Sequence, residues 1–455
     1  MIPARAAAWR LRLALTGRSL EHLRTMQRLA KATRAEVEAY QQDRLRTLLL
    51  HAYEKVPYYR EVLTEAAVIQ QGRLVLDNFT RLPILDKATI RRRFDDLSAT
   101  DVASRKARVN TSGGSTGEPV KFLQDHQADE WKIATKLLFD SWTGYRPGEP
   151  VALLWGAGRD LQESGWRTRL GTALRSELRL NAYLMSEQIS DDYIAKLNEF
   201  RPSLILAYAQ SIFNLAVHAE KTSQRLVSPT AVMTSATTLE DEMRTVIERV
   251  FGAPVFDRYG SREVSDVACD YGDRLGLVVS PATHLVEVLT EDGLPVRPGE
   301  TGEIVVTLLS NFSMPLLRFR IGDMAIQGET GLGEISWPRL AKVLGRTTDV
   351  FYTVDGKHIY GGYFTRHFYG KDWVAQFQVE QLAYEQLQVR IVPTEPLGEE
   401  FLVAQKQELV NAFKEIMGPA TVIDIAIVDD IPVGPTGKRR YTISNLAPPP
   451  GSRAP

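Results

Sequence analysis

The fold is decided by residues 231–256, AVMTSATTLEDEMRTVIERVFGAPVF, which predict a strand, a helix and a second strand in direct succession. The first three residues form a short apolar run that is typical of a buried strand. Thr238, with Asp241 three residues later, is predicted to cap the start of the helix, and Gly252 to end it. The apolar stripe of this helix consists of Met243, Val246, Ile247, Val250 and Phe251. A β-α-β unit of this kind indicates a layered α/β architecture.

Outward from this unit, the apolar patterns divide the chain into a large part and a small part. Residues 1–60 are predicted to be largely helical, with a stripe formed by Leu45, Leu48, Leu49 and Ala52. We predict an N-terminal domain over residues 1–347, a small C-terminal lobe over 348–446 and a disordered, proline-rich tail over 447–455.

The small lobe is predicted from a change of pattern near residue 345. Two alternating strands flank one helix that Gly418 ends, which is typical of an α+β unit. The apolar positions are Leu387, Val389 and Ile391 in the first strand, Leu402, Leu409, Phe413 and Ile416 in the helix, and Ile423, Ile425 and Ile427 in the second strand.

The composition is that of an ordinary globular protein. Of 455 residues, 44% are hydrophobic and 24% are charged, with a formal net charge of −1, so the overall charge favours no nucleic-acid partner. The single cysteine, Cys269, excludes an internal disulfide and agrees with a reducing compartment. No apolar run approaches the ~20 residues of a membrane span, so we expect a cytoplasmic protein without a transmembrane segment. A basic N-terminal helix lying on a membrane surface is the alternative.

Residues 111–117 read Thr-Ser-Gly-Gly-Ser-Thr-Gly, a loop rich in glycine and hydroxyl groups. Its backbone N–H groups can wrap around a phosphate, and its hydroxyls add further donors, although it lacks the Gly-Lys-Ser/Thr ending of a P-loop. Residues 113–117 also match the nucleophile elbow of serine hydrolases, but Pro119 and the extended Val120–Leu123 follow where that motif needs a helix. The flanks predict strand–loop–strand. A phosphate-binding loop and an unliganded turn are therefore the two interpretations.

A second segment, Asp257–Glu263, is predicted to be a turn directly after a strand. Ligands of open α/β sheets gather beyond the carboxyl ends of strands. Tyr259 offers an aromatic face for a base, and Glu263 offers an oxygen ligand for Mg²⁺. A surface turn with Glu263 paired to an arginine is the alternative.

Three further segments lie nearer the C-terminus. Arg318–Asp323 places Asp323 after a glycine turn, where its oxygens can accept hydrogen bonds from ribose hydroxyls. Gly345–Asp349 lies at the predicted domain boundary. Gly434–Lys438 presents a lysine that suits a phosphate or carboxylate oxygen. Taken singly, each is also compatible with an ordinary turn.

In this order the five segments resemble the successive core motifs of the adenylate-forming (ANL) superfamily, which contains acyl-CoA synthetases, adenylation domains and luciferases. Residues 51–59 and 376–381 are similar to its phenylacetate–CoA ligase-like branch, including members associated with capsule and polysaccharide loci. The resemblance spans about residues 40–442. It implies a large multi-layer α/β adenylation domain and a small, mobile α+β lobe that hinges at Thr348 and Asp349.

The resemblance also implies which residues bind ATP. The nucleotide would be held by Thr111, Ser112, Gly113, Gly114, Ser115, Thr116 and Gly117 at its phosphates, by Ser235, Ala236 and Thr237 at adenine, and by Tyr259, Gly260 and Ser261 beside the base. Glu263 would bind Mg²⁺ and Asp323 the ribose, while Arg346 matches the arginine that follows the hinge glycine. Lys438 matches the catalytic lysine of the mobile lobe, so that Glu263 and Lys438 are the expected catalytic residues.

The chain departs from the family pattern at three places. Thr348 replaces the first of two adjacent acids at the hinge, and Arg262 precedes Glu263 where many relatives have a hydroxyl residue. Some relatives hold zinc through cysteines and a histidine in this region. Here Cys269 has no such companions, so we expect no zinc site, because structural zinc needs four ligands.

We therefore expect an ATP- and Mg²⁺-dependent ligase that adenylates a small carboxylic acid and transfers the acyl group, with coenzyme A as the expected acceptor. An amine or a carrier-protein thiol is the alternative acceptor, and a homodimer is compatible with the sequence. A catalytically degenerate nucleotide-binding partner in polysaccharide biosynthesis is the alternative from another class. A serine hydrolase using Ser115 is the third hypothesis. Trp142, Trp155, Tyr183 and Tyr208 are candidates for the acyl pocket or for the core.

Lys438→Ala should lower acid-dependent adenylation by about 10²-fold or more, because one preorganised charge is lost at a phosphoryl transition state. Pyrophosphate exchange measures this step. Acyl transfer from a presynthesised acyl-adenylate should be spared, and an equal loss in both half-reactions would contradict the assigned role.

Overall fold

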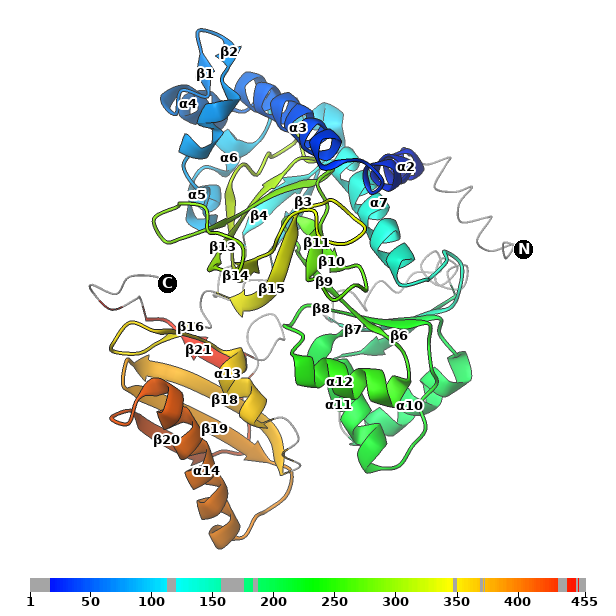
Figure 1. The fold of residues 1–455 in the computed structure, drawn as a ribbon, viewed down its shortest axis with the longest axis vertical. Coiled ribbons are helices and arrows are strands. Elements are labelled where there is room, and N and C mark those ends of the chain that lie inside the picture. Colours follow the sequence, from blue (N-terminus) through cyan, green and yellow to red (C-terminus); the bar gives the residue numbers. More distant parts are fainter. Residues whose placement is uncertain are drawn as a thin grey trace.

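The computed structural model describes residues 17–112, 120–156, 176–182, 187–346, 350–368, 371, 373–432, 440–446 and 449. Three helices open the described chain and lie along one side of the large domain (Figure 1): α2 (Ser19–Leu29), α3 (Arg34–Lys55) and α4 (Pro57–Glu65). A capping box between Thr33 and Glu36 starts α3. The predicted stripe is confirmed, since Leu45, Leu48, Leu49 and Ala52 are all buried.

Short elements connect these helices to the domain centre. They are β1 (Ile69–Gln70), β2 (Arg73–Leu74), η1 (Leu76–Arg81), α5 (Lys87–Arg92), α6 (Phe94–Leu97) and η2 (Val102–Arg105). The hairpin of β3 (Arg108–Thr111) and β4 (Lys121–Gln124) follows, paired antiparallel. This hairpin confirms the predicted strand–loop–strand pattern around residues 111–123.

The centre of the domain is a sheet of eleven strands within the described residues. Its parallel half runs in the order β9-β8-β7-β5-β6. The strands are β5 (Val151–Trp155), β6 (Glu177–Asn181), β7 (Leu204–Tyr208), β8 (Ala231–Ser235) and β9 (Val255–Ser261). One face is covered by α10 (Glu187–Phe200), α11 (Ala209–Lys221) and α12 (Asp241–Phe251), which Figure 1 shows in green, and α7 (His126–Trp142) packs on the other.

The predicted β-α-β unit is confirmed as β8, α12 and β9, and Gly252 ends the helix in the left-handed conformation. The predicted cap was wrong. Helix α12 begins at Asp241, whereas a cap at Thr238 would have started it two residues earlier. Glu240 occupies the cap position, and its side chain makes no capping hydrogen bond. The reason is that Leu239, just before the cap, is buried in one cluster with Met243, which fixes where the chain enters the helix.

The antiparallel half of the sheet continues from β9 through β10, β11, β15, β14 and β13 to β12. These strands are β10 (Ser265–Asp270), β11 (Leu277–Val279), β12 (His284–Leu289), β13 (Thr301–Leu308), β14 (Phe319–Gln327) and β15 (Arg339–Arg346). Two sequence interpretations were wrong here. Residues 257–261 continue β9 instead of forming a turn, and Asp323 lies inside β14, because both segments gain ladder partners that only the fold supplies.

The C-terminal residues form a separate sheet with its own core, below the large domain in Figure 1. A hairpin of β16 (Val350–Tyr352) and β17 (His358–Tyr360), then α13 (Gly362–Thr365) and η4 (Arg366–Phe368), lead into it. It contains β18 (Val374–Ala383), β19 (Gln386–Pro393), α14 (Glu399–Met417), β20 (Val422–Ile427) and β21 (Thr442–Ser444), in the sheet order β20-β19-β18-β21.

The strand, helix and strand predicted for this lobe are confirmed as β19, α14 and β20, and α14 ends at Gly418 as expected. Its predicted boundary, at residues 347–348, falls outside the described residues and stays a prediction. The same holds for the disorder of the tail. None of the described helices has the length and apolar character that crossing a membrane would require.

Asp125 joins the glycine-rich hairpin to the centre of the domain. It is 1% exposed and follows β4 directly. Its carboxylate accepts a hydrogen bond from Ala128 N at 2.8 Å, which caps α7, and bonds from Phe312 N and Ser313 N at 3.0 Å each. One buried side chain thus fixes a helix start and a distant loop together.

Asp125→Ala should lower the free energy of unfolding of the large domain by about 3 kcal/mol or more, because the cap is lost and two buried N–H groups lose their acceptor. Urea denaturation followed by tryptophan fluorescence measures this change. Asp96→Ala, which removes a half-exposed carboxylate on α6, is the control and should change stability by under about 0.5 kcal/mol. Equal effects of the two substitutions would contradict the assigned role.

Candidate active site

Three of the predicted ATP-binding side chains meet at one point of the large sheet. Asp323 of β14 is paired in register with Arg346 of β15, and Arg346 Nε lies 3.2 Å from Asp323 Oδ1. Tyr259, at the end of β9, donates its hydroxyl to Asp323 Oδ2 at 2.8 Å. Residues separated by up to 87 positions in the chain, 346 minus 259, are therefore in direct contact.

Burial dominates the electrostatics of the Asp323 carboxylate. The residue is 8% exposed, and burial raises its pKa, while Arg346 and the Tyr259 hydroxyl oppose that rise only in part. Burial and the adjacent carboxylate raise the pKa of Tyr259 well above its usual value, so the phenol remains a donor. The positive charge of Lys87 also lowers the pKa of Asp323.

Two buried atoms of this cluster are left for a ligand. Asp323 Oδ1 and Arg346 Nε are close, yet neither makes a hydrogen bond of good geometry within the described part of the chain. Buried polar atoms are nearly always satisfied in complete structures. An acceptor beside a donor suits a diol such as the two hydroxyls of a ribose.

Glycines allow the backbone to pass closely on either side of this cluster. Gly322 and Gly345 have φ angles of +89° and +102°, which other residues adopt only with strain. A Cβ at Gly322 would lie 3.5 Å from Arg346 Nη2, and one at Gly345 would lie 3.5 Å from Thr238 Oγ1. The second contact brings the residues after β8 next to the Asp323 cluster.

The predicted adenine segment begins at Ser235, the last residue of β8, and continues into the exposed Ala236 and Thr237. Ala236 has a φ of +71°, an uncommon conformation for a residue with a side chain, so the chain turns sharply here. Thr237 Oγ1 accepts a hydrogen bond from Gln210 N at 3.4 Å, at the start of α11. The segment therefore lies between the N-terminus of a helix and the Asp323 cluster.

Glu263 is buried with one cationic partner. It is 5% exposed, and its Oε1 lies 3.5 Å from Lys87 Nζ of α5. The preceding Arg262 carbonyl accepts a hydrogen bond from Gln124 Nε2 at 3.1 Å, which ties this turn to the hairpin of the glycine-rich loop. No local sequence pattern indicated Lys87 or Gln124, because their contacts with Glu263 and Arg262 span 176 and 138 positions of the chain.

A single buried carboxylate is suited to Mg²⁺ that arrives with phosphates. Mg²⁺ is usually bound by one or two carboxylates, substrate phosphates and waters instead of a full protein cage. No cluster of three metal-ligating side chains occurs among the residues that the structure describes. Glu263 would supply the protein ligand, and the metal would offset charge on the phosphate oxygens.

Other predicted residues have different positions. Thr111 ends β3, and Ser112 Oγ accepts a hydrogen bond from Val120 N at 2.8 Å, which closes the base of the loop. A Cβ at Gly260 would lie 2.3 Å from the Ser265 carbonyl oxygen, so this glycine is required by packing between β9 and β10. Ser261 Oγ is buried without a hydrogen-bond partner in the described chain.

The remaining candidates lie outside the described residues or in the core. The candidates outside the described residues are Gly113, Gly114, Ser115, Thr116, Gly117, Tyr183, Thr348, Asp349 and Lys438. Trp142 packs against Phe139, Tyr271 and Trp337, so it belongs to the core. Trp155 and Tyr208 have ring centroids 4.7 Å apart at the ends of β5 and β7.

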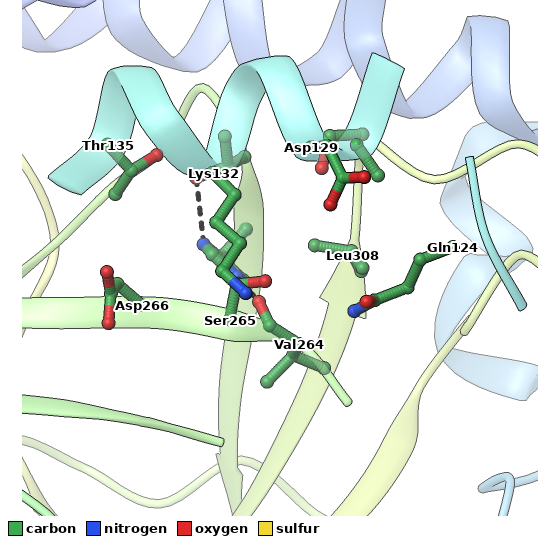
Figure 2. Close-up of a pocket in the computed structure, with 12 residues that line it drawn as sticks. Gln124, Asp129, Lys132, Thr135, Val264, Ser265, Asp266 and Leu308 are labelled. Carbon is green, nitrogen blue, oxygen red and sulfur yellow. Dashed lines mark hydrogen bonds between the residues drawn. The ribbon is translucent and has the colours of Figure 1, made fainter. Parts of the chain in front are cut away.

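Behind the Glu263 turn the structure has a polar pocket (Figure 2). Its walls are Asp129, Lys132 and Thr135 of α7 on one side and Val264, Ser265 and Asp266 on the other. None of the predicted nucleotide-binding residues lines it. His284 is at its base, 1% exposed; its Nε2 donates to the Val264 carbonyl at 2.7 Å, and its Nδ1 accepts from Thr283 Oγ1 at 2.8 Å. His284 thereby positions the residue after Glu263, a role that the sequence did not indicate.

Comparison with known proteins agrees with this geometry. Residues 351–445 match the family model described as the CapK C-terminal domain. The chain is 27% identical over 342 residues to a phenylacetate-coenzyme A ligase of Thermus thermophilus, covering 72% of this chain and 74% of the relative. It is 24% identical over 398 residues to protein CapK of Staphylococcus aureus, covering 86% and 85%.

The fold is similar to that of solved acyl-CoA ligases. The 2-hydroxyisobutyryl-CoA ligase in its postadenylation state, in complex with R3-HIB-AMP, has a TM-score of 0.70 at 19% identity, covering 92% of this chain and 91% of that one. The fold is that of the adenylate-forming ligases. The similarity to phenylacetate-coenzyme A ligases and to protein CapK confirms the resemblance seen in the motifs, and the fold confirms the predicted α/β class.

The chain differs in its similarity to two states of one solved protein. Against the 2-hydroxyisobutyryl-CoA ligase with 2-HIB-AMP and CoA in the thioesterification state, the TM-score is 0.57 at 20% identity. The overall arrangement is therefore more similar to the postadenylation state.

Lowering the pH should destabilise the protein through His284. Burial lowers its pKa to about 4, against about 6.5 in the unfolded chain, so between these values the unfolded state binds more protons. Stability is therefore retained above pH 6.5 and lost as the pH falls toward 4, by about 2 kcal/mol at pH 5. Urea unfolding from pH 4.5 to 7.5 measures this.

His284→Gln keeps a donor for the Val264 carbonyl but cannot titrate, so it should flatten this pH dependence. His126→Gln, at a half-exposed histidine of α7, is the matched control and should leave the slope unchanged. The same slope in wild type and His284→Gln would refute the assignment.

Proposed function

We propose that this chain uses ATP to adenylate a carboxylic acid and then transfers the acyl group to the thiol of coenzyme A. The observation that supports this most directly is the contact of Tyr259, Asp323 and Arg346. They come from three separate motifs, and buried Glu263 and Lys87 are near enough for their charges to act on Asp323. A surface turn would not bring these groups together.

Each group has a role that its geometry suits. Asp323 accepts hydrogen bonds from the ribose hydroxyls, beside the guanidinium of Arg346 with which it forms an ion pair. Tyr259 and Ser235–Thr237 border the adenine. Glu263 would supply the protein ligand for Mg²⁺, which would offset the charge of the phosphates, and residues 111–117 of the glycine-rich loop would bind the β- and γ-phosphates.

The first reaction joins two anions, so the site must offset negative charge. A carboxylate oxygen attacks the α-phosphorus, the bond from that phosphorus to the bridging oxygen breaks, and pyrophosphate leaves with the electron pair. Positive charge at the phosphoryl oxygens lowers this barrier, and no protein nucleophile is needed. Lys87 is one partly exposed cation available beside Glu263, and Lys438 is the expected second.

The second reaction consumes the acyl-adenylate. The coenzyme A thiol loses its proton to solvent, its sulfur attacks the acyl carbon, and AMP leaves with the oxygen. The acceptor is proposed because the relatives named above include phenylacetate-coenzyme A ligases. A similar fold also occurs in the amide bond synthetase McbA of Marinactinospora thermotolerans, with a TM-score of 0.51, so an amine is the rival acceptor.

Acid-dependent exchange of labelled pyrophosphate into ATP tests the first reaction, and mass spectrometry with coenzyme A or amines identifies the acceptor. Exchange with at least one acid supports the proposal. Tight ATP binding without exchange for any acid in a broad panel would reject it and favour a degenerate nucleotide-binding protein.

Asp323→Asn should lower kcat/KM for ATP by about 10- to 100-fold, because a charged acceptor worth about 1.5–3 kcal/mol is replaced by a neutral one. Steady-state pyrophosphate release at varied ATP measures this. Asp292→Asn, in the exposed turn after β12, is the control and should behave as wild type. An unchanged kcat/KM in Asp323→Asn would show that ribose does not bind there.

A further inference from the structure

Four side chains stand at one level along the carboxyl end of the parallel strands. Register places Tyr208 of β7 opposite Ser235 of β8, and Thr234 opposite Asp257, so Ser235 adjoins Arg258 of β9. Strand alternation places Ser235 and Arg258 on the same face as Met233 and Phe256, which pack in one cluster with Phe139 of α7, whereas the Tyr208 ring packs in the cluster of the α11 face. Trp155 of β5 completes the row.

Arg258 and Trp155 lean toward each other across this row. Strands β8 and β7 separate β9 from β5, so their backbones are about 14 Å apart at the usual strand spacing. Nevertheless, Arg258 Cζ lies 5.9 Å from the Trp155 ring centroid. Both side chains must therefore extend over Tyr208 and Ser235, at the strand ends where ligands of open α/β sheets bind.

The guanidinium of Arg258 has too few partners for its burial. The residue is 8% exposed, and its Nε has no hydrogen-bond partner among the residues that the structure describes. Its ion pair is with Asp266, at 3.5 Å from Nε to Oδ1, which is longer than a normal hydrogen bond. A guanidinium has five N–H donors and cannot lose its charge, so leaving them unpaired is costly.

The surrounding carboxylates do not complete the site. Asp140 of α7 forms an ion pair with Lys136, and Asp257 accepts a hydrogen bond from Thr234 Oγ1 at 3.0 Å. Together with Asp266, they give Arg258 a negative surrounding without a direct hydrogen bond. A further full negative charge is therefore disfavoured here, whereas a neutral oxygen that accepts a hydrogen bond is suited to the free donors.

The site lies beside the proposed reaction centre. Ser235 is the first residue of the segment that borders the nucleotide, and it adjoins Arg258. An acid whose carboxylate meets the α-phosphate near this segment would extend its acyl chain along β8 toward the guanidinium. Resting on the proposed function, we propose that the acid carries a neutral hydrogen-bond-accepting oxygen on its acyl chain, as a hydroxyl, ether or carbonyl group, and that Arg258 selects it.

Matched pairs of acids test this proposal: phenylacetate with 4-hydroxyphenylacetate, butyrate with 3-hydroxybutyrate and hexanoate with 5-oxohexanoate. Pyrophosphate exchange gives kcat/KM for each. Wild type should prefer the oxygenated member of at least one pair by about 10²-fold or more, because a site built to hydrogen-bond an oxygen rejects the analogue that lacks it. Arg258→Met should lower this preference to under about 10-fold, mainly by losing activity on the oxygenated acid.

Two further variants separate recognition from folding. Asp266→Asn removes the ion pair but keeps the guanidinium, so it should preserve the preference. If Arg258→Met fails to fold, Arg258→Lys takes its place in the test. It keeps the charge but not the planar fork, so it should give an intermediate preference for the oxygenated acid. ATP affinity, measured by calorimetry, should be unchanged in every folded variant. Acyl-sulfamoyl adenosines are analogues of the acyl-adenylate that cannot react. Their dissociation constants, measured by calorimetry for the same pairs of acyl groups, should show the same preference for the oxygenated member.

The failures are distinguishable. Exchange with equal kcat/KM for both members of every pair, or a preference that survives in Arg258→Met, overturns this inference and leaves the proposed function standing. No exchange with any acid while ATP still binds overturns both.

Discussion

The structure depends on the contacts of one buried carboxylate inside the large sheet. Asp323 is nearly enclosed, and burial raises its pKa. Arg346 across the ladder and the Tyr259 hydroxyl from β9 are its partners and oppose that rise. For this contact to form, β9 must lie within reach of β14 and β15, which requires the parallel and antiparallel halves to be one continuous sheet. The cluster therefore joins the two halves of the domain.

The residues after β8 connect two chemically different regions. On one side, Thr238 approaches Gly345 and so borders the Asp323 cluster. On the other side, Ser235 adjoins Arg258, which contacts Trp155 over the strand ends. One short segment can thus present a nucleotide to one group of side chains and an acyl chain to another. The strained Ala236 lies between them, as backbone strain often does at functional sites.

Local sequence patterns were enough to predict those elements and element ends that depend on residues close together in the chain. The stripe of α3, the β8-α12-β9 unit and the end of α14 at Gly418 were all predicted correctly, because periodicity and helix-stopping residues act over a few positions. The Thr238 cap was wrong, because burial of Leu239 outweighed a capping preference worth only about 1 kcal/mol. The turns expected near Tyr259 and Asp323 are strand residues, because their ladder partners lie far away in the chain.

The sequence by itself determined the type of the elements with strong apolar periodicity, the order of the motifs and the set of groups proposed to hold a nucleotide. It did so because those features follow from short-range spacing and side-chain chemistry. Only the tertiary structure decided that Tyr259, Asp323 and Arg346 touch, that Lys87 lies beside Glu263, and that Arg258 is buried with few partners. These depend on strand order and register, which bring together residues far apart in sequence and exclude water from the charges that meet there.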